Sequence, residues 1–155
     1  MKQLFLLLSA ALFLLAATPQ QGLAIDYEWI TQQGKSASLT DYRGKPLILH
    51  FWASWCPPCR EEMPELSSWV KAHPEFTLVA VSLDEDMQEI EKFLETNNIS
   101  LPALQGNKNE VVRLGIRGLP ATLLIDAKGE ILRQRIGAVP WKDPAASANF
   151  LQHLQ

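Results

Sequence analysis

The chain has 155 residues, 47% of them hydrophobic and 20% charged, which is the balance of an ordinary globular protein with one domain. Its 14 Lys and Arg residues are outnumbered by 17 Asp and Glu residues, and the formal net charge is −3. Such a chain lacks the basic face that electrostatic binding of nucleic acid requires, so we exclude that class of partner.

The first 24 residues have the pattern of an export signal. Lys2 precedes an apolar stretch from Leu4 to Ala17, and Gly22-Leu23-Ala24 places small residues where a signal peptidase cuts. This stretch of about 14 residues is shorter than the roughly 20 that span a bilayer. We expect a signal peptide over residues 1–24 and a folded domain over residues 25–155, in the periplasm or another extracytoplasmic space. An uncleaved inner-membrane anchor and a buried core helix are the alternatives.

The rest of the chain alternates between strand and helix patterns. Two short strand candidates flank a turn at Gly34 and predict an N-terminal β-hairpin, over residues 25–30 and 36–39. Apolar runs typical of strands buried on both faces of a sheet follow at residues 47–52, 76–83 and 121–125. Helix patterns follow the cysteines and recur further on, at residues 87–94, 107–114 and 143–154, and a last strand is expected over residues 130–136. This order predicts an α/β sandwich around a central mixed sheet.

The two cysteines of the chain stand together in Cys56-Pro57-Pro58-Cys59, directly after the predicted strand over residues 47–52. At the start of a helix, free N–H groups and the positive end of the helix dipole stabilise a thiolate at Cys56. Cys59 lies one turn further in and can resolve a mixed disulfide. Pro57 and Pro58 fit the first helical turn, where a missing N–H costs nothing. The pattern favours a redox-active Cys56–Cys59 disulfide.

Other uses of the two cysteines compete with redox chemistry. A structural disulfide across so short a loop contributes only about 2 kcal/mol in the chain-entropy treatment, less than the roughly 3 kcal/mol of a 15-residue loop. A zinc site needs more ligands, and His50, His73 and His153 show no ligand spacing, so we expect no metal cofactor. Haem attachment needs a His where Arg60 stands. A non-enzymatic carrier that holds Cu(I) with both thiolates stays open.

The surroundings of the cysteines resemble the active-site segment of the TlpA/ResA/CcmG-like branch of the thioredoxin superfamily. The resemblance rests on three stretches, residues 51–64 (FWASWCPPCREEMP), 40–46 (TDYRGKP) and 117–126 (RGLPATLLID). With the turn that follows, it runs from about Ser38 to Gly137. It implies a thioredoxin-like sandwich, a mixed sheet flanked by helices, and the activity of a protein-disulfide oxidoreductase.

The resemblance also implies roles for residues around the two sulfurs. Pro120 should follow a cis peptide bond and face the cysteines, which leaves the Leu119 backbone free to pair with an extended client segment. Trp55 should line the exposed approach to Cys56, next to Pro57. We therefore expect Trp55, Pro57 and Leu119 to contact the client.

Two polar residues are candidates for moving protons at the cysteines. Glu62 follows Cys59 by three residues, and the corresponding acid of ResA-like proteins lies near the cysteines. The alternative is a solvated side chain beside Glu61. His50 stands six residues before Cys56, where thioredoxins carry a buried Asp. It is either a hydrogen-bonded core residue or a proton acceptor for Cys59, whereas a protonated His50 would make the pair more oxidising.

The expected reaction is reduction of client disulfides by the Cys56 and Cys59 dithiol. Relatives in this branch serve cytochrome c maturation, copper-site assembly or spore envelope formation, which implies clients such as apocytochrome c or copper-site proteins. The chain carries no flavin or nicotinamide motif, so we expect no cofactor, a separate membrane or periplasmic electron donor, and a monomer. An oxidising disulfide donor is the alternative direction, because potentials of such pairs run from about −270 to about −120 mV.

Overall fold

Seven strands form one mixed sheet in residues 24–154, the part of the chain that the structure, a computed structural model, describes. Across the sheet the strands follow the order β2-β1-β5-β4-β3-β6-β7. Their bounds are β1 (Glu28–Thr31), β2 (Ser36–Ser38), β3 (Leu47–Trp52), β4 (Leu78–Ser82), β5 (Leu104–Gly106), β6 (Ala121–Ile125) and β7 (Ile131–Ile136). The central strand β3 pairs parallel with β4 and antiparallel with β6, which confirms the predicted mixed sheet.

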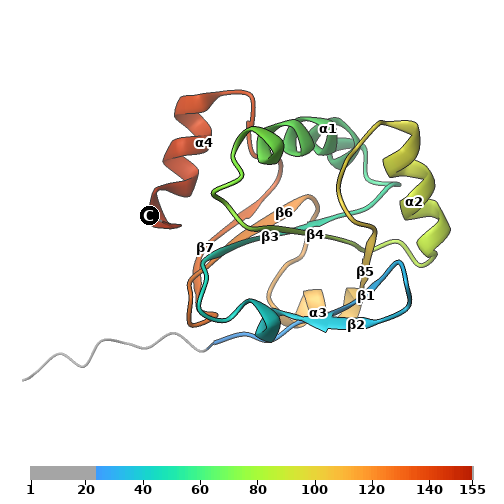
Figure 1. Cartoon of the computed structure of the whole chain (residues 1–155), viewed down its shortest axis with the longest axis horizontal. Helices are drawn as coiled ribbons and strands as arrows, with labels where there is room; N and C mark the ends of the chain where they lie inside the picture. Colours follow the sequence, from blue (N-terminus) through green and yellow to red (C-terminus); the bar gives the residue numbers. More distant parts are fainter. Residues whose placement is uncertain (1–23, 155) are drawn as a thin grey trace, which may run out of the picture.

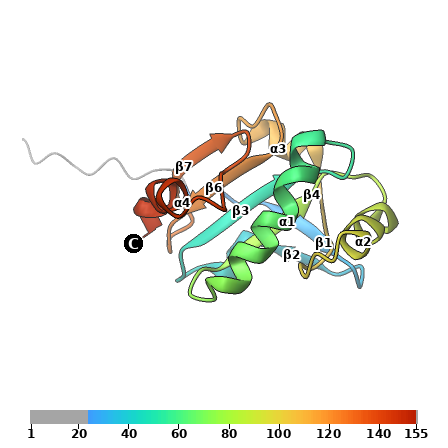
Figure 2. The same cartoon turned by 90° about the horizontal axis from the view of Figure 1, so that it is seen from above.

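Helices cover both faces of this sheet, as Figures 1 and 2 show. Their bounds are α1 (Pro57–Ala72), α2 (Met87–Thr96), α3 (Lys108–Arg113) and α4 (Pro144–Leu151), with short 3₁₀ turns η1 (Leu39–Tyr42) and η2 (Gln152–Leu154). The helices α1, α2 and α4 pack on one face, and α3 packs on the other. Side-chain oxygens accept hydrogen bonds from the first turns of α2, α3 and α4, and these N-caps are Asp86, Asn107 and Asp143.

The alternation of side chains along β3 divides the core between the two faces. Ile48 and Trp52 belong to the core beneath α1, whereas Leu49 and Phe51 belong to the core on the α3 face. His50 is fully buried and has the same parity as Ile48 and Trp52. The imidazole therefore lies on the face that α1 covers.

The structure confirms the N-terminal hairpin, in which β1 and β2 pair antiparallel. Residue 39 was predicted to extend the second strand, but it begins η1, because the Ser38 side chain caps that turn. The three-residue strand β5 was missed, since so short a segment shows no periodicity. None of the helices in residues 24–154 is long and apolar enough to cross a membrane. The predicted signal peptide lies outside the described residues except for Ala24.

Candidate active site

The two cysteines lie at the N-terminus of α1, beyond the end of the buried strand β3. Cys56 is the N-cap residue, and Pro57 and Pro58 occupy the first two helical positions. The sulfurs of Cys56 and Cys59 form a disulfide, with the Cα atoms 5.3 Å apart. Cys59 is fully buried, whereas Cys56 is 5% exposed and lines a surface groove. A nucleophile or client that arrives from solvent therefore meets the sulfur of Cys56.

The segment before β6 lies beside the cysteine loop. The Leu119–Pro120 peptide bond is cis, as the resemblance implied. Phe51 pairs with Ala121 across β3 and β6, which places Pro120 level with the end of β3. Leu119 lines the same groove as Cys56, and within residues 24–154 its backbone makes no hydrogen bond to other backbone groups. The groove thus offers an unpaired backbone segment next to the accessible sulfur.

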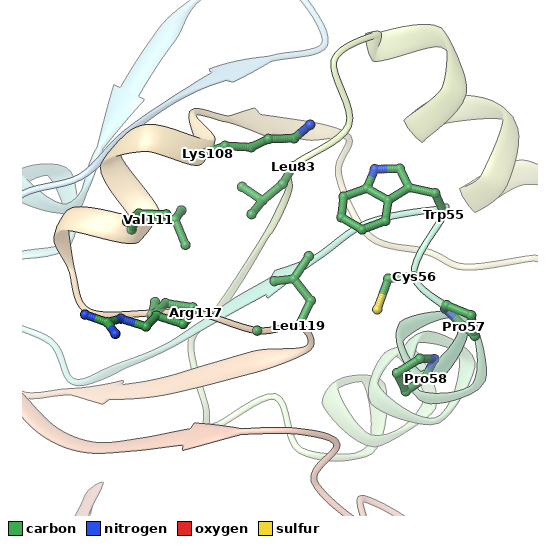
Figure 3. Close-up of a pocket in the computed structure, with 12 residues that line it drawn as sticks. Trp55, Cys56, Pro57, Pro58, Leu83, Lys108, Val111, Arg117 and Leu119 are labelled. Carbon is green, nitrogen blue, oxygen red and sulfur yellow. The ribbon is translucent and has the colours of Figure 1, made fainter.

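The groove has a volume of about 470 Å³ and lies between the cysteine loop and α3. Trp55 is 58% exposed and forms one wall, next to Cys56, Pro57 and Pro58. Figure 3 shows Trp55 above the Cys56 sulfur and Leu119 between Cys56 and the far end of the groove. Trp55, Pro57 and Leu119, the predicted client contacts, therefore line one surface.

Glu62 is buried rather than solvated, so the alternative of an exposed side chain is wrong. It lies three residues after Cys59 on the apolar side of α1, which it shares with Met63, Leu66 and Trp69. Its Oε1 accepts hydrogen bonds from the Val139 N–H at 2.8 Å and from the Trp141 indole N–H at 2.7 Å. Burial nevertheless raises the pKa of Glu62 to about 7.

His50 faces Glu62 from the sheet side of this buried site. Its Nδ1 lies 3.0 Å from Oγ1 of Thr122, the residue opposite it on β6. Its Nε2 lies 3.9 Å from Oε2 of Glu62, and neither atom has a hydrogen-bond partner among the described residues. Burial lowers the pKa of His50 to about 3, which favours a neutral imidazole over the protonated form considered from the sequence.

Comparison with known proteins agrees with this geometry. Residues 21–134 match the AhpC/TSA family. The chain belongs to this family. It is 36% identical over 113 residues to sporulation thiol-disulfide oxidoreductase A of Bacillus subtilis, covering 69% of this chain and 68% of that protein. It is 31% identical over 135 residues to thiol-disulfide oxidoreductase ResA of Geobacillus thermodenitrificans, covering 85% and 74%.

Solved structures confirm the thioredoxin-like fold of this AhpC/TSA family member. The crystal structure of StoA from Bacillus subtilis superposes with a TM-score of 0.67 at 29% identity, covering 87% of this chain and all of that one (100%). A thiol:disulfide interchange protein from Chlorobium tepidum gives a TM-score of 0.67 at 27% identity, covering 89% and 97%. With its Cys-x-x-Cys pair, the chain is a thiol–disulfide oxidoreductase of the ResA and StoA type.

Two residues of the site were not found from the sequence. Trp141 was interpreted as a packing residue, and it does pack on Trp69, but its indole N–H also binds Glu62. The available signal was general, because a buried indole N–H needs an acceptor. Asp84 was not considered, although its carboxylate accepts hydrogen bonds from the backbone N–H and hydroxyl of Ser54, at 2.9 and 2.7 Å. Asp84 thereby holds the loop that presents Trp55.

Residues 24–154 contain no group of three or more His, Cys, Asp or Glu side chains arranged to hold a metal ion. The groups that the structure places at this site are the two sulfurs, the buried carboxyl and imidazole, and the groove beside them.

Proposed function

We propose that the protein reduces disulfides of client proteins outside the cytoplasm. The Cys56 thiolate attacks one client sulfur, and the other client sulfur leaves as a thiolate. Cys59 then attacks Cys56, the client's second thiolate leaves, and the Cys56–Cys59 disulfide remains. Two electrons pass to the client, and a separate donor must return two electrons to the protein. The observation that carries this proposal is the difference between the two sulfurs, since Cys56 lines the groove and Cys59 is fully buried.

The buried pair of His50 and Glu62 supports the reducing direction. A strong oxidant of this fold is one whose reduced form is stabilised, chiefly as a thiolate. A neutral His50 adds no positive charge here, and an ionised Glu62 would disfavour a thiolate at Cys59. Arg60, the cation next to Cys59 in the chain, is exposed and donates to the Ser54 carbonyl, so solvent screens its charge from the buried Cys59. These features favour a pair that gives electrons away.

We propose that Glu62 supplies the proton that Cys59 takes up on reduction. When the donor opens the Cys56–Cys59 disulfide, Cys59 needs one proton, and a protonated Glu62 on the same side of α1 supplies it. The proton returns to Glu62 when Cys59 attacks the mixed disulfide. Because Oε1 already accepts two hydrogen bonds, the proton resides on Oε2, which faces Nε2 of His50 at 3.9 Å.

We propose that the client binds in the groove and along the segment that contains the cis-proline. An extended client segment pairs with the free backbone of Leu119 while its cysteine bonds to Cys56, and Pro120 holds this segment beside the sulfurs. Trp55 and Pro57 contact the residues on either side of the client cysteine. We propose that the clients are apocytochrome c or copper-site proteins, and that a membrane or periplasmic protein donates the electrons. We further propose that the signal in residues 1–24 exports the chain and that residues 25–155 act as a monomer.

Trapping of the mixed disulfide tests the proposed order of attack. With Cys59→Ser, the client should remain bound to Cys56 through a disulfide that a thiol reductant releases. Cys56→Ser is the matched control, since it keeps one thiol but removes the accessible one. Adducts formed by the Cys56→Ser variant, or none formed by the Cys59→Ser variant, would count against the proposal. Stoichiometric Cu(I) binding without any disulfide reductase activity would favour a copper carrier instead.

A further inference from the structure

The groove beside Cys56 is apolar at its base and exposes apolar side chains at its rim. Leu83, Val111 and Ile116 are buried in its lining, whereas Trp55 and Val112 are 58% and 59% exposed. Exposed apolar side chains gathered around a depression are typical of a surface that binds a partner. The groove is therefore suited to receive an apolar side chain of the client.

Two cations border this apolar surface, and none of the described residues that line it carries a carboxylate. Lys108 lies over the Trp55 ring, with Nζ 5.6 Å from the ring centroid, and it forms an ion pair with Glu85 at 2.9 Å. Arg117 is exposed and makes no ion pair or side-chain hydrogen bond within residues 24–154. Figure 3 shows Lys108 reaching from α3 towards Trp55, and Leu119 between Cys56 and Arg117. The net charge at the edge of the groove is positive, because Glu85 offsets Lys108 and leaves Arg117 unpaired among the described residues.

We propose that the groove selects client segments that carry an apolar residue next to the reactive cysteine and a carboxylate within the next few residues. This inference rests on the proposed reductase function and specifies the chemistry of its clients. An extended segment advances about 3.3 Å per residue, and neighbouring side chains point to opposite sides. The side chains one and three positions from the client cysteine therefore lie on the same side of a segment paired with Leu119, the nearer one for the apolar groove and the further one for Arg117 and Lys108. Complementary charges of this kind set specificity and association rate more than affinity.

Reduction of matched peptides tests this inference on the unmodified protein. Each peptide contains one cysteine, activated as a mixed disulfide with thionitrobenzoate, in an uncharged frame. The peptides differ in the residue beside the cysteine, Leu or Ser, and in the residue two positions further on, Glu, Gln or Lys. The protein is first reduced with a dithiol, which is then removed. The Cys56 thiolate attacks the peptide sulfur and releases coloured thionitrobenzoate, which gives the second-order rate constant. Cys59 then attacks Cys56, which releases the peptide thiol and leaves the Cys56–Cys59 disulfide.

We expect the rate constants to fall in the order Glu, Gln, Lys, and Leu peptides to react faster than Ser peptides. An exposed ion pair changes a rate by about 1.4-fold to 5-fold and a like-charge contact lowers it by a similar factor, so the Glu peptide should exceed the Lys peptide by at least about twofold. Added salt should reduce this ratio, because it screens exposed charges. Equal rates for Glu and Lys peptides would overturn the inference, and so would a preference for Lys. Failure to reduce any of the peptides would overturn the proposed function as well.

Charge reversal locates the preference in the groove. In the double variant Lys108→Glu, Arg117→Glu the ratio of the Glu to the Lys rate constant should fall below one. Lys35→Glu is the matched control, because Lys35 is an exposed cation in the β1–β2 turn, away from the groove. The ratio should be unchanged in that control. If the single variants Lys35→Glu and Arg117→Glu shift the ratio of the two rate constants equally, the net charge of the protein sets the preference and the inference is wrong.

Discussion

Replacement of Glu62 by Gln removes a buried acid and keeps the length and shape of its side chain. The amide oxygen can still accept from the Val139 N–H and the Trp141 indole N–H, which bind Oε1 in the native protein. The variant therefore isolates the titration of the carboxyl from its packing.

The magnitude follows from the shift in the pKa of Glu62. Burial raises this pKa from 4.5 to about 7, so the folded protein binds a proton that the unfolded chain releases between these values. The protonated carboxyl therefore stabilises the fold fully below pH 4.5, and this stabilisation is lost as the pH rises through about 7. At about 1.36 kcal/mol per pKa unit, the loss amounts to about 3 kcal/mol.

His50 contributes a change of the opposite sign. Its pKa is lowered to about 3 in the folded protein, so stability from this group rises as the pH increases from about 3 to 6.5. This contribution is shared by the native protein and the Glu62→Gln variant. The difference in stability between the two proteins therefore reports the carboxyl of Glu62.

Urea denaturation of the two oxidised proteins provides the assay. Relative to the native protein, the free energy of unfolding of Glu62→Gln should be about 3 kcal/mol higher at about pH 8 than at about pH 4.5, so the variant gains relative stability as the pH rises. Glu61→Gln serves as the control, because Glu61 is the exposed neighbour on α1, and its difference should stay constant. A constant difference for Glu62→Gln as well would refute the assignment of a buried, protonated carboxyl.

Two further substitutions probe the partners of this buried pair. Trp141→Phe removes a hydrogen bond that lowers the pKa of Glu62, so the pH-dependent loss of stability should move to higher pH. The control Trp29→Phe should leave the midpoint of this loss in place. An unmoved midpoint for Trp141→Phe would contradict the contact between Trp141 and Glu62. Thr122→Val removes the hydrogen-bond partner of His50 Nδ1 at nearly constant shape and should lower the free energy of unfolding in urea by about 1–3 kcal/mol. No measurable loss of stability would show that Nδ1 has another hydrogen-bond partner.

The parts of the site that could be predicted from the sequence are local in the chain. The cysteine motif contains both sulfurs and the two prolines that begin α1, and the apolar run over residues 47–52 coincides with β3. The burial of Glu62 also had a local signal. Glu62 shares the helical phase of Cys59 and Met63, whereas Glu61 next to it does not.

The contacts that give these residues their chemistry could not be predicted, because they join distant segments. Val139 and Trp141 bind Glu62 from 77 and 79 positions further along the chain. Thr122 binds His50 from 72 positions away, and that pairing depends on the register of β3 against β6. No periodicity within a single segment carries such information, so the neutral state of His50 became apparent only in the folded chain.

The reduction potential of the Cys56–Cys59 pair tests the proposed reductase most directly. The purified protein is equilibrated in buffers with defined ratios of a dithiol to its disulfide, and the reduced fraction is counted by alkylation and mass. We predict a value near the roughly −270 mV of thioredoxin, because neither a neutral His50 nor the Glu62 carboxyl stabilises a thiolate. A value near the roughly −120 mV of the oxidant DsbA would contradict the account, since it would make the protein a disulfide donor.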